Sequence, residues 1–317
     1  TNPDNPIQGE VWYNDTDKVL KFQYNATNAA GSWATGGSMN TARSVSSGFG
    51  IYNAAVTAGG STPSVTANVE SYNGTSWTEV NNLNTARQEN TGAGIESAGL
   101  VYGGATPPVT GATESFNGTN WTEVNDMTTA RKAGAGSGTQ TSAIIFGGSP
   151  YPSNDSLTES WNGTNWTEVN DLNTGRTALA GAAADNTAAL VFGGYEPPPA
   201  DTNSVKTELW NGSNWTEVND MNQLREALAG IGVSTAALTF GGSKGGPGPA
   251  AETELWNGTN WTEVADLNQA RSQMPQGSGT STAGLGYGGQ TPASPGFLTN
   301  NEIWSGTTPT TVTFTDS

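Results

Sequence analysis

Charged side chains recur at regular positions along this chain of 317 residues, and this regularity limits the chemistry they can perform. All the arginines occupy one repeated position, 44 to 49 residues apart: Arg43, Arg87, Arg131, Arg176, Arg225 and Arg271. One glutamate series lies eight residues before five of them (Glu79, Glu123, Glu168, Glu217, Glu263), and a second recurs elsewhere in the repeat (Glu70, Glu114, Glu159, Glu208, Glu254, Glu302). An active site is built once, whereas scaffold residues are copied with the repeat. The pattern therefore predicts ion pairs, and hydrogen bonds donated to backbone carbonyls, that hold connecting loops.

The remaining polar residues give weak support for catalysis or metal binding. The chain has no Cys and no His, which excludes thiolate chemistry and the usual zinc, copper and haem sites. Four carboxylates outside the repeated positions could form a glycosidase pair, but nothing brings two of them together: Asp155, Asp185, Glu196 and Asp201. Repeated turn aspartates (Asp126, Asp171, Asp220, Asp266) leave calcium as an alternative to ordinary turn chemistry. We expect no enzyme, no cofactor and no metal site.

A tryptophan and a glycine pair frame each arginine and define the repeat. The tryptophans lie ten residues before the arginines: Trp33, Trp77, Trp121, Trp166, Trp215 and Trp261. The glycine pairs follow at 59–60, 103–104, 147–148, 193–194, 241–242 and 288–289. A period in this range is typical of solenoids and propellers.

Each repeat contains four segments with strand character. A small-residue segment such as 133–138 and an apolar run such as 143–148 come first, and a hairpin such as 159–169 with an Asn-Gly turn follows. Four strands in each of six units predict an all-β, six-bladed β-propeller of four-stranded antiparallel blades. Small residues would form the innermost strands, and aromatic residues would fill the gaps between blades.

This combination of motifs resembles the kelch-repeat family over residues 32–304: a glycine pair, a glutamate two residues before an aromatic residue, a tryptophan, and an arginine after a short loop. The near-verbatim copies of NGTNWTEV are similar to those of phage and other repeat-rich structural proteins. Separately, residues 5–25 resemble the short hairpin modules of phage tail-fibre proteins. We therefore expect an N-terminal hairpin extension over 1–31 and a propeller over 32–317.

One strand must close the ring, because a propeller with partial repeats would otherwise leave an open edge. The last repeat has a third strand near Glu302 to Trp304 but no good fourth strand, and a spare fourth strand lies near Ser32 to Thr35. We predict that this N-terminal strand closes the ring. Val312 to Phe314 are the alternative source.

Charge and hydropathy narrow the range of partners. The net charge of −17 disfavours nucleic acid, and no apolar run approaches the length of a membrane span. A first residue of Thr suggests a fragment or processed product. We expect a virion or extracellular protein that binds a host-surface glycan or protein, or neighbouring virion proteins, with a possible homo-oligomer formed through an N-terminal stem. A free-standing lectin or protein-interaction propeller is the alternative.

Recognition is expected where the repeats differ. The loops between strands two and three vary in every repeat, and they should emerge on the same face as the loops that lead into the next blade. The uniform Asn-Gly hairpins should lie on the opposite face. We predict ligand contacts from variable-loop residues Tyr151, Asn154, Asp155, Tyr195, Glu196, Asp201 and Lys244, because tyrosine with carboxylate or amide groups suits sugar recognition.

Overall fold

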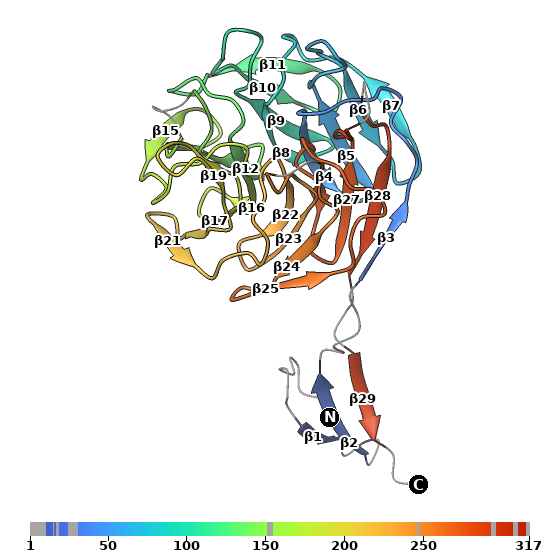
Figure 1. Ribbon diagram of the computed structural model, residues 1–317. Helices are drawn as coiled ribbons and strands as arrows, with labels where there is room; N and C mark the ends of the chain where they lie inside the picture. The colour runs from blue at the N-terminus through green and yellow to red at the C-terminus, as the bar shows by residue number, and fades with distance from the viewer. Residues whose placement is uncertain are drawn as a thin grey trace.

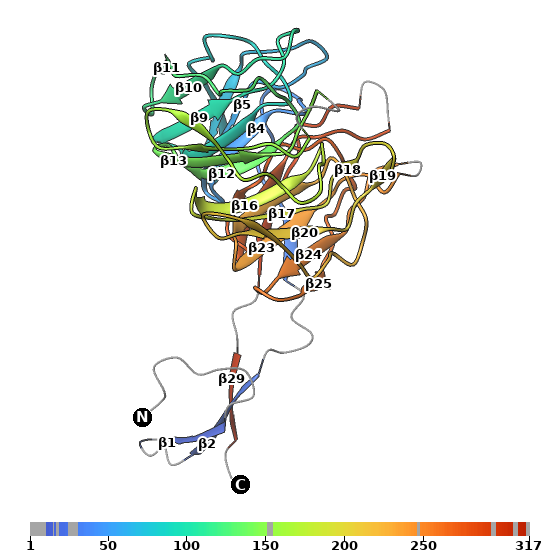
Figure 2. The same cartoon turned by 90° about the vertical axis from the view of Figure 1, so that its left-hand side faces the viewer.

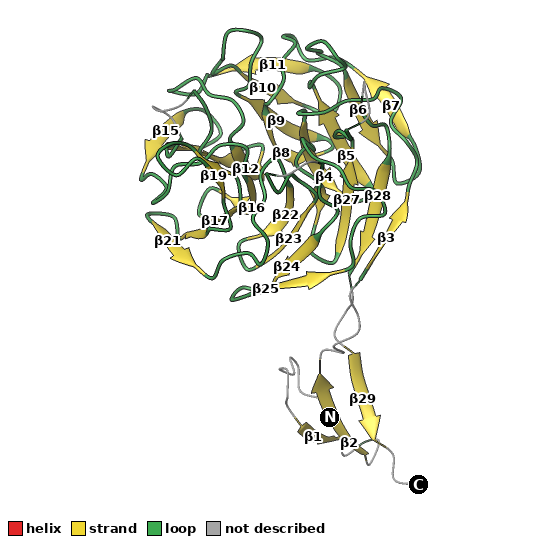
Figure 3. Cartoon of the chain, viewed as in Figure 1, coloured by secondary structure: helices red, strands yellow, loops and turns green. Residues whose placement is uncertain are grey.

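The computed structural model describes residues 11–14, 16, 19–24, 31–150, 155–245, 248–292, 296–306 and 310–314. Every regular element in these residues is a β-strand, and no helix occurs among them (Figure 3). No helix long and apolar enough to cross a membrane is therefore found in the described chain. The predicted all-β class is confirmed.

Six four-stranded antiparallel sheets stand around a common axis as the blades of a propeller (Figure 1). The strands run from the axis outwards in chain order, except at the ring closure. Blades one to three contain β4 (Ser47–Ile51), β5 (Ala54–Ala58), β6 (Val69–Tyr72) and β7 (Trp77–Val80); β8 (Thr91–Ile95), β9 (Ala98–Tyr102), β10 (Thr113–Phe116) and β11 (Trp121–Val124); β12 (Ala135–Thr139), β13 (Ser142–Phe146), β14 (Thr158–Trp161) and β15 (Trp166–Val169).

Blade four carries an additional two-stranded hairpin in the loop between its second and third strands. Blades four to six contain β16 (Ala180–Asp185), β17 (Ala188–Phe192), β20 (Thr207–Trp210) and β21 (Trp215–Val218); β22 (Ala229–Val233), β23 (Ala236–Phe240), β24 (Thr253–Trp256) and β25 (Trp261–Val264); β26 (Ser278–Gly279), β27 (Ala283–Tyr287), β28 (Asn301–Ser305) and β3 (Ser32–Thr35). The additional hairpin consists of β18 (Tyr195–Glu196) and β19 (Thr202–Asn203). The predicted six-bladed propeller is confirmed.

The N-terminal strand β3 closes the ring, as predicted. It pairs antiparallel with β28, with Ser32 opposite Ser305 and Trp33 opposite Trp304. This pairing covers the outer edge of β28, which would otherwise be left without a partner.

A small three-stranded sheet lies outside the ring (Figure 2). It consists of β1 (Val11–Asn14), β2 (Val19–Tyr24) and β29 (Thr310–Phe314), with β2 in the centre. The alternative in which Val312 to Phe314 close the ring is therefore wrong, because β29 pairs with β2 instead. The six blades end at Ser305, whereas the sequence analysis extended the propeller to residue 317.

Aromatic side chains fill the spaces between neighbouring blades. The strand-four tryptophan of each blade packs against an aromatic ring of the preceding blade; for example, the ring centroids of Trp215 and Phe146 lie 5.0 Å apart and those of Trp77 and Tyr287 also lie 5.0 Å apart. At four seams the indole N–H donates to a threonine of that preceding blade, as Trp261 does to Thr207 at 3.0 Å. These four seams thus combine apolar burial with a directional contact.

Glycine on the inner strands allows these blades to approach each other closely. A Cβ added at Gly181 would lie 2.5 Å from Cζ of Phe146 in the preceding blade. Gly50 has a different role, because its φ of +105° is rarely accessible to a residue with a side chain. Glycines of the inner strands therefore serve two purposes: they allow close approach between blades, and they allow a backbone conformation with positive φ.

The repeated arginines lie in the protein interior and pair with the second glutamate series. Arg225 donates to a carboxylate oxygen of Glu254 at 2.8 Å and to the carbonyls of Gly241 and Glu252 at 3.0 and 2.6 Å. Equivalent pairs are Arg43–Glu70, Arg87–Glu114, Arg131–Glu159, Arg176–Glu208 and Arg271–Glu302. Burial lowers the pKa of Arg225, while Glu254 opposes that shift. The guanidinium groups thus hold the loop that enters each blade to the third strand of that blade.

Candidate binding site

Six residues, one in each blade, form a ring of backbone hydrogen bonds around the propeller axis. Each lies two positions after a repeated arginine, and each has a left-handed φ between 46° and 54°: Val45, Glu89, Ala133, Ala178, Ala227 and Gln273. The N–H of each residue donates to the carbonyl of its equivalent in the preceding blade, over distances of 2.7 to 2.9 Å. The last donor, Val45, bonds to Gln273 and completes the circle. We call this feature the axial ring.

The axial ring separates two spaces on the propeller axis. On one side is a funnel of about 550 Å³, lined by Ser44, Val45, Ser61, Gln88, Glu89, Lys132, Ala133, Ser149, Thr177, Ala178, Glu226, Ala227, Ser243, Ser272, Gln273 and Gln290. On the other side is a smaller chamber of about 110 Å³, to which all six ring residues also contribute. The funnel belongs to the face that carries the variable loops, because its other residues follow either the repeated arginines or the glycine pairs.

Most of the described residues that line the funnel are polar, and none of them is aromatic or an arginine. Its hydroxyl and amide groups come from five serines, one threonine and three glutamines. The titratable residues in the described lining are Glu89, Lys132 and Glu226, which together carry a formal charge of −1. Such groups both donate and accept hydrogen bonds, and they suit a ligand rich in hydroxyl groups.

Glu89 and Lys132 neutralise each other on one side of the funnel. Nζ of Lys132 lies 2.9 Å from Oε2 of Glu89, and both side chains are partly exposed. The pair bridges blades two and three. It therefore presents a dipole to the funnel rather than a free charge.

Glu226 provides the unpaired charge of the funnel. This half-buried residue of blade five lies across the ring from blade two, and its backbone is held by reciprocal hydrogen bonds with Ser243 of 2.9 and 2.8 Å. Its carboxylate has no hydrogen bond or ion pair within the described chain. Burial raises the pKa of Glu226, with no opposing partner. The site thus contains one carboxylate without a counter-charge.

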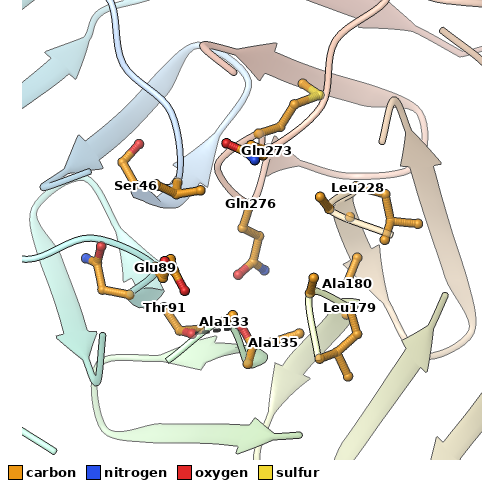
Figure 4. A pocket seen from close by; sticks show the side chains of 18 residues that line it. Ser46, Glu89, Thr91, Ala133, Ala135, Leu179, Ala180, Leu228, Gln273 and Gln276 are labelled. Atoms are coloured by element: carbon orange, nitrogen blue, oxygen red, sulfur yellow. Dashed lines mark hydrogen bonds between the residues drawn. The ribbon is translucent and has the colours of Figure 1, made fainter. Parts of the chain in front are cut away.

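The chamber beneath the axial ring is less polar. Leu179, Leu228 and Met274 contribute side chains to it, together with small residues of the inner strands. The side chain of Gln276 extends into the middle of this space (Figure 4). Gln276 also lines the opening on the hairpin face, so it lies between the chamber and that opening.

Three of the residues predicted to contact ligand come together in blade four, but they bond within their own loop. The hydroxyl of Tyr195 donates to Asp201 across the β18–β19 hairpin. Glu196 accepts a 2.7 Å hydrogen bond from Ser204 and pairs with Lys206 at 2.9 Å. Burial of Glu196 opposes its ionisation, but these two partners outweigh burial and hold its pKa below the usual value. These contacts stabilise the loop.

The other predicted contact residues do not join this group. Lys244 pairs with Glu252 in the loop of blade five. Asp155 lies in blade three beside Gly175, and its carbonyl accepts a hydrogen bond from the N–H of Arg176. Tyr151 and Asn154 fall outside the described residues. None of the described predicted residues lines the funnel.

The sequence analysis missed the charged residues of the funnel: Glu89, Lys132 and Glu226. All three lie one or two positions after a repeated arginine. The residue directly after the arginine is Ser, Gln, Lys, Thr, Glu and Ser in successive repeats, although the preceding strand is nearly invariant. This variation beside a constant residue was the available signal. The longer loops between strands two and three vary more strongly and therefore mask it.

Comparison with known proteins agrees with the class of fold, a six-bladed β-propeller. No family model and no curated protein matches the chain, whereas 410 solved chains resemble it in structure. Among them is one titled "Structure of YjhT", with a TM-score of 0.71 and 12% sequence identity; the match covers 88% of this chain and 99% of that one. At this identity the likeness shows the fold alone. A propeller of this kind fits a binding module, and the resemblances to kelch repeats and phage fibres stay predictions.

Proposed function

We propose that this protein is a non-enzymatic binding module that captures a ligand in the axial funnel. The observation that carries the proposal is the location of sequence variation. The tryptophans, the arginines and their buried glutamates are repeated to hold the blades, whereas the funnel-lining residue directly after each arginine is Ser, Gln, Lys, Thr, Glu and Ser in successive blades. Variation on a rigid scaffold is typical of recognition surfaces.

The position of the small sheet supports display of the funnel. In the first five blades an Asn-Gly hairpin joins strands three and four, whereas in blade six the chain continues from β28 to β29 and from β2 to β3. Ser305 and Ser32 pair at this end of blade six, so the small sheet is connected to the propeller on the hairpin face. The funnel opens on the opposite face and remains accessible.

We further propose that the module belongs to a virion or extracellular appendage and attaches it to a host-surface glycan or protein. The resemblance of residues 5–25 to phage tail-fibre hairpins supports this assignment. A homo-oligomer formed through an N-terminal stem would present several funnels together and raise the avidity of attachment. A free-standing lectin or interaction propeller would use the same funnel.

A glycan and cell-surface binding panel tests the proposal. The doubly substituted variant Thr177→Trp/Ser272→Trp would fill the funnel, and Thr119→Trp would add the same side chain on the exposed hairpin face. We expect the first variant to lose capture and the second to retain it. If the filled variant still captures the ligand, the binding site lies on the variable loops instead. Exchange of the 149–157 and 195–206 loops would then identify which of them binds.

A further inference from the structure

The charge distribution of the funnel indicates which ligand it accepts, provided that the funnel is the binding site proposed above. All six arginines are buried in ion pairs with the second glutamate series, so none is available to an acidic ligand. Lys132, the one cation among the described residues that line the funnel, is already paired with Glu89. An anionic sugar or phosphate would have to compete with Glu89 for this lysine and would also meet the charge of Glu226. The funnel is therefore poorly suited to anions.

Glu226 has the opposite consequence for cations. Its carboxylate is partly desolvated and has no counter-charge, so a cationic group of a ligand would stabilise its ionised form. Glu89 and Lys132 are the other titratable groups that line the same space, and they neutralise each other. The described residues contain no cluster of three metal-ligating side chains, and Glu226 and Glu89 belong to blades on opposite sides of the ring. An organic cation therefore fits this arrangement better than a coordinated metal ion.

The other residues that line the funnel indicate the chemical nature of the rest of the ligand. Serine hydroxyls and glutamine amides line the same funnel as Glu226. Such groups match the alternating hydrogen-bond donors and acceptors of a polyhydroxylated molecule. The alanines of the axial ring form a small apolar floor. We propose that the funnel binds an amino sugar through its primary ammonium group, with Glu226 as the counter-charge.

The direct test is titration of the full chain with glucosamine, followed by NMR of ¹³C-labelled alanine methyl groups. Ala178 and Ala227 lie in the axial ring and report binding in the funnel. We expect saturable shifts at both methyl groups. Because the interaction depends on one charge pair, Glu226→Gln should weaken binding by at least about tenfold. Glu217→Gln removes the same charge from an exposed strand position and should leave binding unchanged.

Other ligands separate the contributions of charge and sugar ring. Glucose and N-acetylglucosamine keep the ring but lack the ammonium group, ethanolamine keeps the ammonium group without the ring, and glucuronate carries the opposite charge. We expect glucosamine to bind most tightly and glucuronate least. Equal binding of glucose and glucosamine, or equal affinity in Glu226→Gln and the unmodified protein, would overturn the proposal. Binding of ethanolamine as tight as that of glucosamine would also overturn it, in favour of an amine-bearing peptide.

The panel described above separates failure of this inference from failure of the proposed function. If glucosamine does not bind but a panel ligand is captured and lost on filling the funnel, the binding module stands and the amino-sugar assignment falls. If filling the funnel leaves every captured ligand bound, the funnel is not the site and both statements fall.

Discussion

The backbone N–H of Glu89 donates to the carbonyl of Val45 in the preceding blade at 2.7 Å, and five equivalent contacts complete a circle around the axis. Every donor in this circle is a residue with a side chain in a left-handed conformation. Such a conformation costs about 1 to 2 kcal/mol per residue. The axial ring therefore holds its residues in unfavourable backbone conformations through contacts between neighbouring blades.

Substitution at Ala178 tests this strain. Glycine accepts a φ of +52° without penalty, so Ala178→Gly should stabilise the protein by about 0.5 to 1 kcal/mol in chemical denaturation. Ala182→Gly, at a buried position of β16 without a left-handed φ, should destabilise it by a similar amount. Destabilisation of similar size in both variants would show that the axial ring is not strained.

The seam between blades six and one contains a polar mismatch. The equivalent of Thr207 in blade six is Asn301, whose buried amide atoms have no hydrogen-bond partner in the described protein, and Nε1 of Trp77 likewise has none. Asn301→Thr should provide the contact made at four of the other seams and raise the free energy of unfolding by about 1 to 2 kcal/mol. The reverse exchange, Thr207→Asn, should lower it by about 1 to 3 kcal/mol. A lower free energy of unfolding for Asn301→Thr would contradict the proposed mismatch at this seam.

Removal of a repeated arginine should be among the most damaging single changes. Arg225→Met leaves the buried carboxylate of Glu254 without its counter-charge and should cost about 3 to 5 kcal/mol, measured by urea denaturation. The double variant Arg225→Met/Glu254→Met removes both charges and should recover part of that loss. No recovery in the double variant would indicate that the carbonyl contacts of Arg225, rather than its ion pair, are decisive.

Glu226 should reduce stability at neutral pH. Burial raises its pKa in the folded protein, so the folded state binds the proton more tightly than the unfolded state. The resulting stabilisation is complete below the usual glutamate pKa and is lost as pH rises through the raised value. Glu226→Gln should therefore increase stability at pH 7 relative to the unmodified protein, and this advantage should disappear in acid.

The size of this effect is limited because Glu226 is only half-buried. We expect less than about 1 kcal/mol after allowance for solvent screening. Thermal denaturation at several pH values measures it, and Glu217→Gln serves as the control with the same change in charge. An advantage of Glu226→Gln that grows in acid would contradict the direction of the pKa shift.

The sequence predicted the architecture closely because the repeat encodes it. The spacing of Trp215 and Arg225, for example, specified one blade, and the incomplete final repeat specified closure by β3. The site was less predictable. Tyr195 and Asp201 are conspicuous in the sequence, but whether their polar groups face solvent or each other depends on the local path of the β18–β19 hairpin. The funnel depends on six positions brought together only by ring closure, and no local pattern reveals how they converge.

Ring closure by β3 also sets an order of events during protein synthesis. Ser32 precedes the strands of all the other blades in the chain, whereas its partner Ser305 follows them, so this pairing must wait until those blades have been synthesised. Such a distant contact closes slowly because most of the chain has to be ordered first. Until then Trp33, buried in the finished protein, has neither Phe240 nor Trp304 to cover it. A nascent chain of this protein therefore carries an exposed tryptophan and an unpaired strand while its blades are being synthesised.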